Sequence, residues 1–178
     1  MTENHSPPPE KRRSALAANL ALGAAAVLAT LVVCELLLRL LGISYPVYVW
    51  TDPIRGVAHI PGAHGGQRLG DGHFWVEINS DGLRGPEIPL AHPPGTFRIA
   101  LLGDSFMEAF EVPFEKTVGE VLGRRLSTLR GTPVEVLNFG VGGYGTAQEE
   151  LTLRHEVWKY SPDLVLLAVT TGNDISDN

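Results

Sequence analysis

Three apolar runs, each followed by glycine and polar residues, organise the second half of the chain. The runs cover 98–102, 134–139 and 164–170. Short runs without polar alternation are typical of strands buried on both faces of a parallel sheet. The Gly-rich turns that follow them lie at 103–105, 140–145 and 172–174. Because ligands bind at the carboxyl ends of parallel strands, the turns predict one shared site.

Helical patterns separate the three runs. One helix should begin near Thr117, which forms a capping-box pattern with Glu120 and is followed by apolar residues at helical spacing. The next should begin near Thr146, paired in the same way with Glu149, and continue to about Tyr160. The order strand, helix, strand, helix, strand predicts two right-handed βαβ units whose three strands are parallel neighbours.

The amino-terminal part of the chain predicts a membrane anchor. Residues 1–14 are polar and Pro-rich, as in a disordered tail, and end in the basic cluster 11–13. An uncharged run of 20 residues then extends from Ala15 to Cys34, long enough as a helix to span the ~30 Å of bilayer hydrocarbon. We expect an anchor over 15–42 that contacts the lipid bilayer, with a cytoplasmic amino terminus, because the positive cluster precedes it. The rest of the chain would then be extracytoplasmic.

Two alternatives remain open for this segment. A cleaved signal peptide would end in a small-x-small site, but the apolar character continues to Ile43 without one. Lipidation of Cys34 would require a small residue just before the cysteine, and residues 31–33 are Leu-Val-Val. Without lipidation, Cys34 is a small apolar residue in a helix.

Residues 43–96 predict a small β-rich segment of short strands and turns. The stretch 73–78 alternates like a half-buried strand, and the turn-forming residues 79–82 follow it. We expect a hairpin appended to the following domain. Arg84 holds a loop by hydrogen bonds in the simpler interpretation and binds a carboxylate or phosphate in the alternative.

The histidines of this segment do not predict a metal site. His59, His64, His73 and His92 fit no known ligand spacing and no helical face, so we interpret them as solvated or loop residues. His155, inside the second predicted helix, is expected to have a structural role.

Composition excludes several classes of function. The net charge is −6 over 178 residues, and no basic patch with interleaved aromatics is present, so a nucleic-acid partner is not expected. Cys34 is the single cysteine, which excludes intrachain disulfides and cysteine-ligated zinc clusters. Nothing in the sequence calls for a cofactor.

Three short motifs in residues 97–178 carry a family resemblance. Gly103-Asp104-Ser105, Gly143 and Gly172-Asn173-Asp174 resemble the first three blocks of the SGNH (GDSL-type) hydrolase superfamily. The resemblance implies a three-layer, flavodoxin-like α/β domain, of which the first three strands are present here. It also implies that Ser105 is the nucleophile and an oxyanion donor through its own N–H, with further donors from the Gly143 N–H and the Asn173 amide. We interpret Asp104 as a turn-former.

Residues 79–87, NSDGLRGPE, resemble a segment that precedes the hydrolase domain in some membrane-anchored SGNH-like proteins. The parent protein would therefore be a membrane-anchored serine esterase, deacetylase or acetyltransferase. Its substrate would be an ester-bearing small molecule, glycan or lipid of the cell envelope.

The family's fourth block, Asp-x-x-His, does not follow Asn173, and no histidine follows His155. Without an imidazole base the serine hydroxyl stays protonated, so we expect this chain to have little esterase activity alone. Three explanations are open: the chain is a fragment of a longer protein, it is a non-catalytic module that binds carbohydrate or lipid, or an upstream histidine such as His73 or His92 is the base.

One competing motif lies in the second turn. Residues 140–145, GVGGYG, match the G-x-G-x-x-G fingerprint of nucleotide-binding oxidoreductases. The acidic residue expected about 20 positions later is poorly matched, because Asp163 comes before the third strand and Asp174 comes too late. This interpretation also leaves Ser105 and Asn173 without a role.

Overall fold

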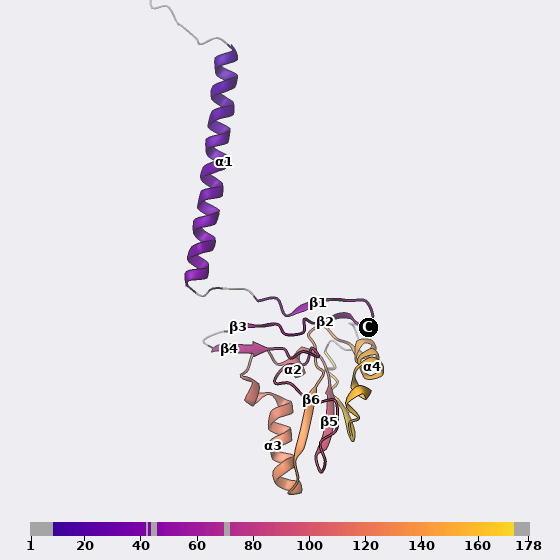
Figure 1. The fold of residues 1–178 in the computed structure, drawn as a ribbon. Helices are drawn as coiled ribbons and strands as arrows, with labels where there is room; N and C mark the ends of the chain where they lie inside the picture. The colour runs from indigo at the N-terminus through magenta and orange to yellow at the C-terminus, as the bar shows by residue number, and fades with distance from the viewer. Residues whose placement is uncertain (1–8, 42, 44–45, 70–71, 173–178) are drawn as a thin grey trace, which may run out of the picture. The chain divides into compact units, whose positions relative to one another are not determined.

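The structure, a computed structural model, describes residues 9–41, 43, 46–69 and 72–172. The chain divides into two units, Met1–Ser44 and Tyr45–Asn178. In the first, helix α1 (Pro9–Leu40) contains a stretch from Ser14 to Leu40 that is long and apolar enough to cross a membrane and is not buried by protein (Figure 1). By length and composition it is a candidate membrane span.

The second unit begins with two antiparallel hairpins. Strand β1 (Val49–Asp52) pairs with β2 (Gly56–His59), and β3 (His64–Leu69) pairs with β4 (Gly72–Glu77). The predicted strand 73–78 is thus confirmed within one residue at each end. Its alternation is also confirmed, since Val76 is fully buried while Trp75 on the opposite face is exposed.

The turn after β4 is held by one asparagine side chain. Asn79 Oδ1 accepts hydrogen bonds from the N–H groups of Asp81 and Leu83, at 3.0 and 2.8 Å. An isolated antiparallel bridge between Ile78 and Arg84 closes the turn. The predicted turn at 79–82 is therefore confirmed, and it returns the chain toward the sheet.

The three predicted strands form one parallel sheet in the order β6-β5-β7. The expected burial on both faces is wrong for β7, where Leu164 is 41 % and Leu167 is 49 % exposed, because β7 pairs with β5 on one side only among the described residues. Strand β5 (Phe97–Leu102) is central and pairs with β6 (Val134–Asn138) and β7 (Leu164–Leu167). Strand β7 stops at Leu167, before the predicted end at Thr170.

Helices pack against this sheet. The principal core contains alternate residues of β5 and β6, such as Ala100 and Leu137, together with Val157 and Tyr160 of the short helix η2 (Val157–Tyr160). Helix α3 (Val118–Arg130) covers β6 through its buried glycines: a Cβ on Gly119 would lie 3.5 Å from the Val136 side chain. Small residues let the helix approach the strand closely (Figure 1).

Both helices begin where predicted, near Thr117 and Thr146, but the predicted caps had different outcomes. Thr117 caps α3, with Oγ1 accepting from the Glu120 N–H at 3.4 Å, as expected. The capping box predicted for Thr146 and Glu149 is wrong, because α4 (Thr146–His155) is capped one residue earlier. There the Gly145 N–H donates to Gln148 Oε1 at 3.1 Å. Helix α4 is followed by the separate helix η2 instead of continuing to Tyr160.

A fully buried arginine fixes the amino end of the central strand. Arg98 donates to Glu135 Oε2 at 2.8 Å and to the carbonyl oxygens of Pro89, Leu90 and Tyr160. Four acceptors offset the cost of burying the guanidinium. The chain entering β5 is thereby tied to β6 and η2.

Candidate functional site

Ser105 stands where the central strand ends and the helix α2 (Ser105–Glu108) begins. The buried Asp104 caps this helix, with Oδ1 accepting from the Phe106 N–H at 2.9 Å, so Asp104 forms the turn as expected. Ser105 itself is partly exposed and lies on an open groove with Phe106 and Val112. The serine is thus presented at the carboxyl edge of the sheet.

Two backbone donors near this edge are unused. In the part of the chain that the structure describes, the N–H groups of Ser105 and Gly143 have no hydrogen-bond acceptor. Gly143 has a φ of +83°, a left-handed conformation that glycine adopts without strain, and it is exposed. Asn173, the third expected donor, lies outside the described residues, so its role stays a prediction.

The Gly-rich turn after β6 lies directly against α2. A Cβ on Gly140 would be 2.6 Å from the Met107 Cβ and 2.8 Å from the Glu108 N, and one on Gly142 would be 3.0 Å from the Glu108 carboxylate. Asn138 ties the two together, because its Nδ2 donates to the Met107 carbonyl oxygen at 2.5 Å and its Oδ1 accepts from the Gly140 N–H at 2.9 Å. The first two predicted turns therefore meet at one edge.

A buried histidine from the β-rich segment also holds α2. His59 Nε2 lies 2.8 Å from Glu108 Oε1, and His59 Nδ1 lies 3.0 Å from the Gly82 carbonyl oxygen. His59 is 5 % exposed and Glu108 is 8 % exposed. The interpretation of His59 as a solvated or loop residue is therefore wrong, because strand β2 points this ring inward.

Arg84 fixes the chain just after α2. Its guanidinium donates to the carbonyl oxygens of Glu108, at 3.0 Å, of Ala109, and of Val112, at 2.7 Å, and lies over the Phe110 ring. Burial lowers the pKa of Arg84, and the Glu108 charge opposes this effect. The guanidinium holds a loop, as the simpler interpretation of the sequence expected. It also stabilises Ala109 in a left-handed conformation, with a φ of 55°.

Three other histidines are more exposed, as expected. His64 and His155 are exposed, and His92 is partly exposed with Nε2 3.0 Å from Asp163 Oδ2; the side chain of His73 lies outside the described residues. Asp163 also accepts from the backbone N–H of Arg98, so His92 is at the amino ends of the strands. The length of β5, roughly 20 Å, separates it from Ser105. His92 is therefore not placed to act as the base.

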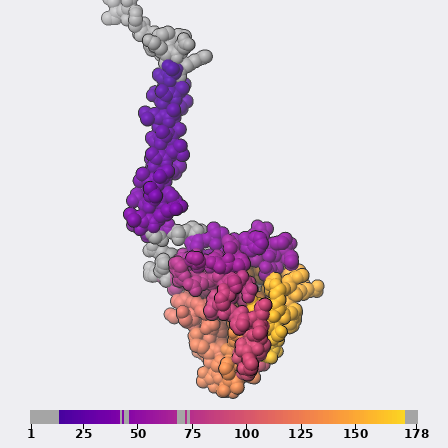
Figure 2. Space-filling view, viewed as in Figure 1, coloured from indigo at the N-terminus to yellow at the C-terminus, as the bar shows by residue number. Residues whose placement is uncertain are grey.

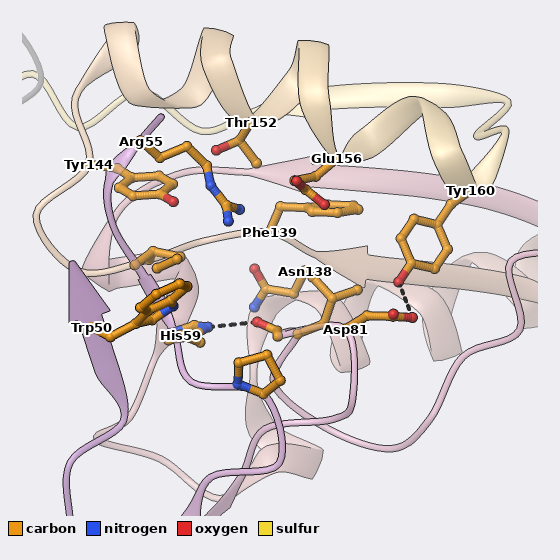
Figure 3. Close-up of a pocket in the computed structure, with 15 residues that line it drawn as sticks. Trp50, Arg55, His59, Asp81, Asn138, Phe139, Tyr144, Thr152, Glu156 and Tyr160 are labelled. Atoms are coloured by element: carbon orange, nitrogen blue, oxygen red, sulfur yellow. Dashed lines mark hydrogen bonds between the residues drawn. The ribbon is translucent and has the colours of Figure 1, made fainter. Parts of the chain in front are cut away.

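A second feature is a cavity of about 90 Å³ between the β1–β2 hairpin and the helices α4 and η2 (Figure 3). Tyr144 and Tyr160 close it by donating to the Val57 carbonyl oxygen at 3.0 Å and to Asp81 Oδ2 at 2.6 Å. Burial raises the pKa of both tyrosines, and the bond to Asp81 adds to the effect at Tyr160. Figure 2 shows the violet surface of the first hairpin meeting the yellow surface near the end of the chain.

No protein-family model matches the chain, and no curated protein matches it significantly. Among the described residues, no cluster of three or more His, Cys, Asp or Glu side chains is placed to hold a metal ion.

Proposed function

We propose that residues 97–178 belong to an SGNH-type serine hydrolase, of which they form the first three strands and the first three motifs. One observation carries the proposal: Ser105 follows the central strand of a parallel sheet, and the next strand delivers the Gly-rich turn to the same edge. The strand order β6-β5-β7 is second-first-third along the chain, which matches the start of a flavodoxin-like sheet.

The proposed reaction is acyl transfer from an ester. Ser105 Oγ attacks the ester carbonyl carbon while its proton passes to a base, and the alcohol then leaves with that proton. Water hydrolyses the acyl-serine, releasing a carboxylic acid and the free serine. The N–H groups of Ser105 and Gly143 and the amide of Asn173 would stabilise the oxyanion, each donor contributing roughly 3 kcal/mol in the transition state.

No described histidine is placed to act as the general base for Ser105. His59, the histidine that bonds to α2, has both ring nitrogens engaged by Glu108 and Gly82. His92 lies at the opposite end of the sheet. We therefore propose that the base comes from an Asp-x-x-His block outside this chain, and that the chain alone is nearly inactive.

The setting proposed for this activity is the cell envelope. Helix α1 would anchor the protein in the bilayer through residues 15–42, with the amino terminus in the cytoplasm because of the basic cluster 11–13. The substrate would then be an extracytoplasmic ester on a small molecule, glycan or lipid.

A second candidate is a non-catalytic module that binds carbohydrate or lipid. The cavity of about 90 Å³ beside Trp50, which aromatic and polar side chains line, favours it. The nucleotide-binding alternative is less favoured, because Met107 and Glu108 fill the space over Gly140 and Gly142 where a pyrophosphate would lie.

Hydrolysis of 4-methylumbelliferyl acetate separates the two candidates. We expect activity from a form extended at its carboxyl end through the following codons of the gene, at least 100-fold above this chain, and its loss in Ser105→Ala. Inactivity of the extended form would support the binding module. Equal activity of the Ser105→Ala variant would overturn the hydrolase proposal.

A further inference from the structure

The cavity between the first hairpin and α4 has the size of a small chemical group. Its volume is about 90 Å³, several times the roughly 10–15 Å³ that one water needs on the same measure. A substituent of a sugar ring fits this space. Trp50 lines the cavity and is 51 % exposed, so it lies where the cavity opens to solvent.

The polar groups inside offer both hydrogen-bond donors and acceptors. Arg55 points into the cavity between Tyr144 and Glu156 (Figure 3), and Asp52 binds one of its amino groups at 2.9 Å. A guanidinium has five N–H groups, so Arg55 has four more with which to donate hydrogen bonds after its bond to Asp52. Glu156 also lines the cavity, and its side chain is 27 % exposed. Its Oε2 accepts from Lys159 Nζ at 2.5 Å, and its second carboxylate oxygen can accept from a ligand.

This arrangement selects a neutral ligand with a donor and an acceptor. The carboxylates of Asp81 and Glu156 would repel an anion, whereas the Arg55 guanidinium would repel a cation. An amide suits these groups, because its carbonyl accepts from the Arg55 guanidinium and its N–H donates to the Glu156 oxygen that Lys159 does not bind. The ring of Phe139 adds an apolar wall that a methyl group can contact.

We propose that this cavity binds the acetamido group of an N-acetylated amino sugar, with the sugar ring stacked on Trp50 at the mouth. Aromatic rings and a few fixed polar groups are typical of such concave sites. The proposal goes beyond the proposed reaction, because Ser105 does not line the cavity and lies on a separate groove.

Binding of triacetylchitotriose to the full chain in detergent micelles, followed by Trp fluorescence and by calorimetry, tests the proposal. We expect saturable binding that is at least tenfold tighter than that of the fully deacetylated trisaccharide and of cellotriose. Trp50→Ala and Glu156→Ala should each weaken it at least tenfold. Circular dichroism of Trp50→Ala and Glu156→Ala checks that both variants are folded, so that a loss of binding in either one is not caused by unfolding.

Trp75→Ala is the matched control, because Trp75 is 57 % exposed and does not line the cavity. It should leave binding unchanged, and so should Ser105→Ala, which separates this proposal from the hydrolase assignment. Absence of binding, equal affinity for the three trisaccharides, or full affinity in the folded Trp50→Ala protein would overturn the proposal.

Discussion

His59 Nε2 lies 2.8 Å from Glu108 Oε1, although 49 positions separate the two residues. The contact joins the β-rich segment to the helix that begins at Ser105. A carbonyl oxygen only accepts, so His59 Nδ1, which faces the Gly82 oxygen, carries a proton. The pair is thus a buried, directional link that places α2.

Removing one partner of this link should destabilise the second unit strongly. Glu108→Ala leaves the buried His59 without its acceptor, and we expect a loss of roughly 3 kcal/mol in the free energy of unfolding. Urea denaturation measures it. The exposed pair of Arg154 and Glu150 is the control: Glu150→Ala should cost less than about 0.5 kcal/mol. Similar losses in the two variants would contradict a buried link at His59.

Arg84 should control the order of the chain around α2. Arg84→Ala leaves three carbonyl oxygens without their donor, and we expect roughly 3 kcal/mol of destabilisation. Amide hydrogen exchange should rise most at residues 106–112. Arg124→Ala is the comparison, because Arg124 donates to one carbonyl from an exposed position and should have little effect. A uniform rise in amide exchange over the whole second unit would indicate general unfolding and would contradict a local role of Arg84.

Two glycines of the second turn should respond differently to alanine. A Cβ at Gly140 would overlap backbone atoms of Met107 and Glu108, so Gly140→Ala must displace α2 and should cost about 1–3 kcal/mol. Gly143→Ala meets no atom within 4 Å and costs only the left-handed conformation, about 1 kcal/mol. Thermal unfolding of both variants checks this order. A larger loss for Gly143→Ala would show that the two turns do not meet as described.

The parallel sheet was predictable because it is encoded locally. Each run carries its own apolar pattern, and the helices between the runs decide that the strands are parallel. The exposure of Leu164 and Leu167 in the third strand could not be predicted, because it depends on what packs against that strand. The Ser105 turn could be found for the same reason. The cap at Gly145 was missed because Thr146 and Glu149 mimic a capping box one residue later.

The contacts that hold the site could not be predicted. His59 acts on α2 across 49 positions, and nothing in its neighbouring residues distinguishes it from a solvated side chain. For Arg84 the sequence predicted a loop held by hydrogen bonds, but not that the loop follows α2, 24 positions away. Arg98 is a charged residue in a strand, and its burial depends on acceptors from three distant segments. Such polar contacts depend on tertiary structure and not on local pattern.

Acid should weaken the first hairpin at a defined pH. The hydrogen bond from Arg55 lowers the pKa of Asp52 to about 2. Because the folded pKa is below the ordinary value, this stabilisation is complete above about pH 4 and is lost as the pH falls toward 2, by roughly 2 kcal/mol in total. Denaturant midpoints between pH 5 and pH 2 measure it. Asp52→Asn should remove this part of the pH dependence, and an unchanged slope would contradict the assignment.

The proposed nucleophile Ser105 should react with a fluorophosphonate, and an added base should accelerate the reaction. Peptide mass spectrometry of this chain after such treatment, with and without imidazole as a substitute base, measures both effects. We predict a slow adduct on Ser105 that imidazole accelerates at least tenfold and that Ser105→Ala abolishes. An adduct on other residues only, or no effect of imidazole on Ser105, would contradict the account.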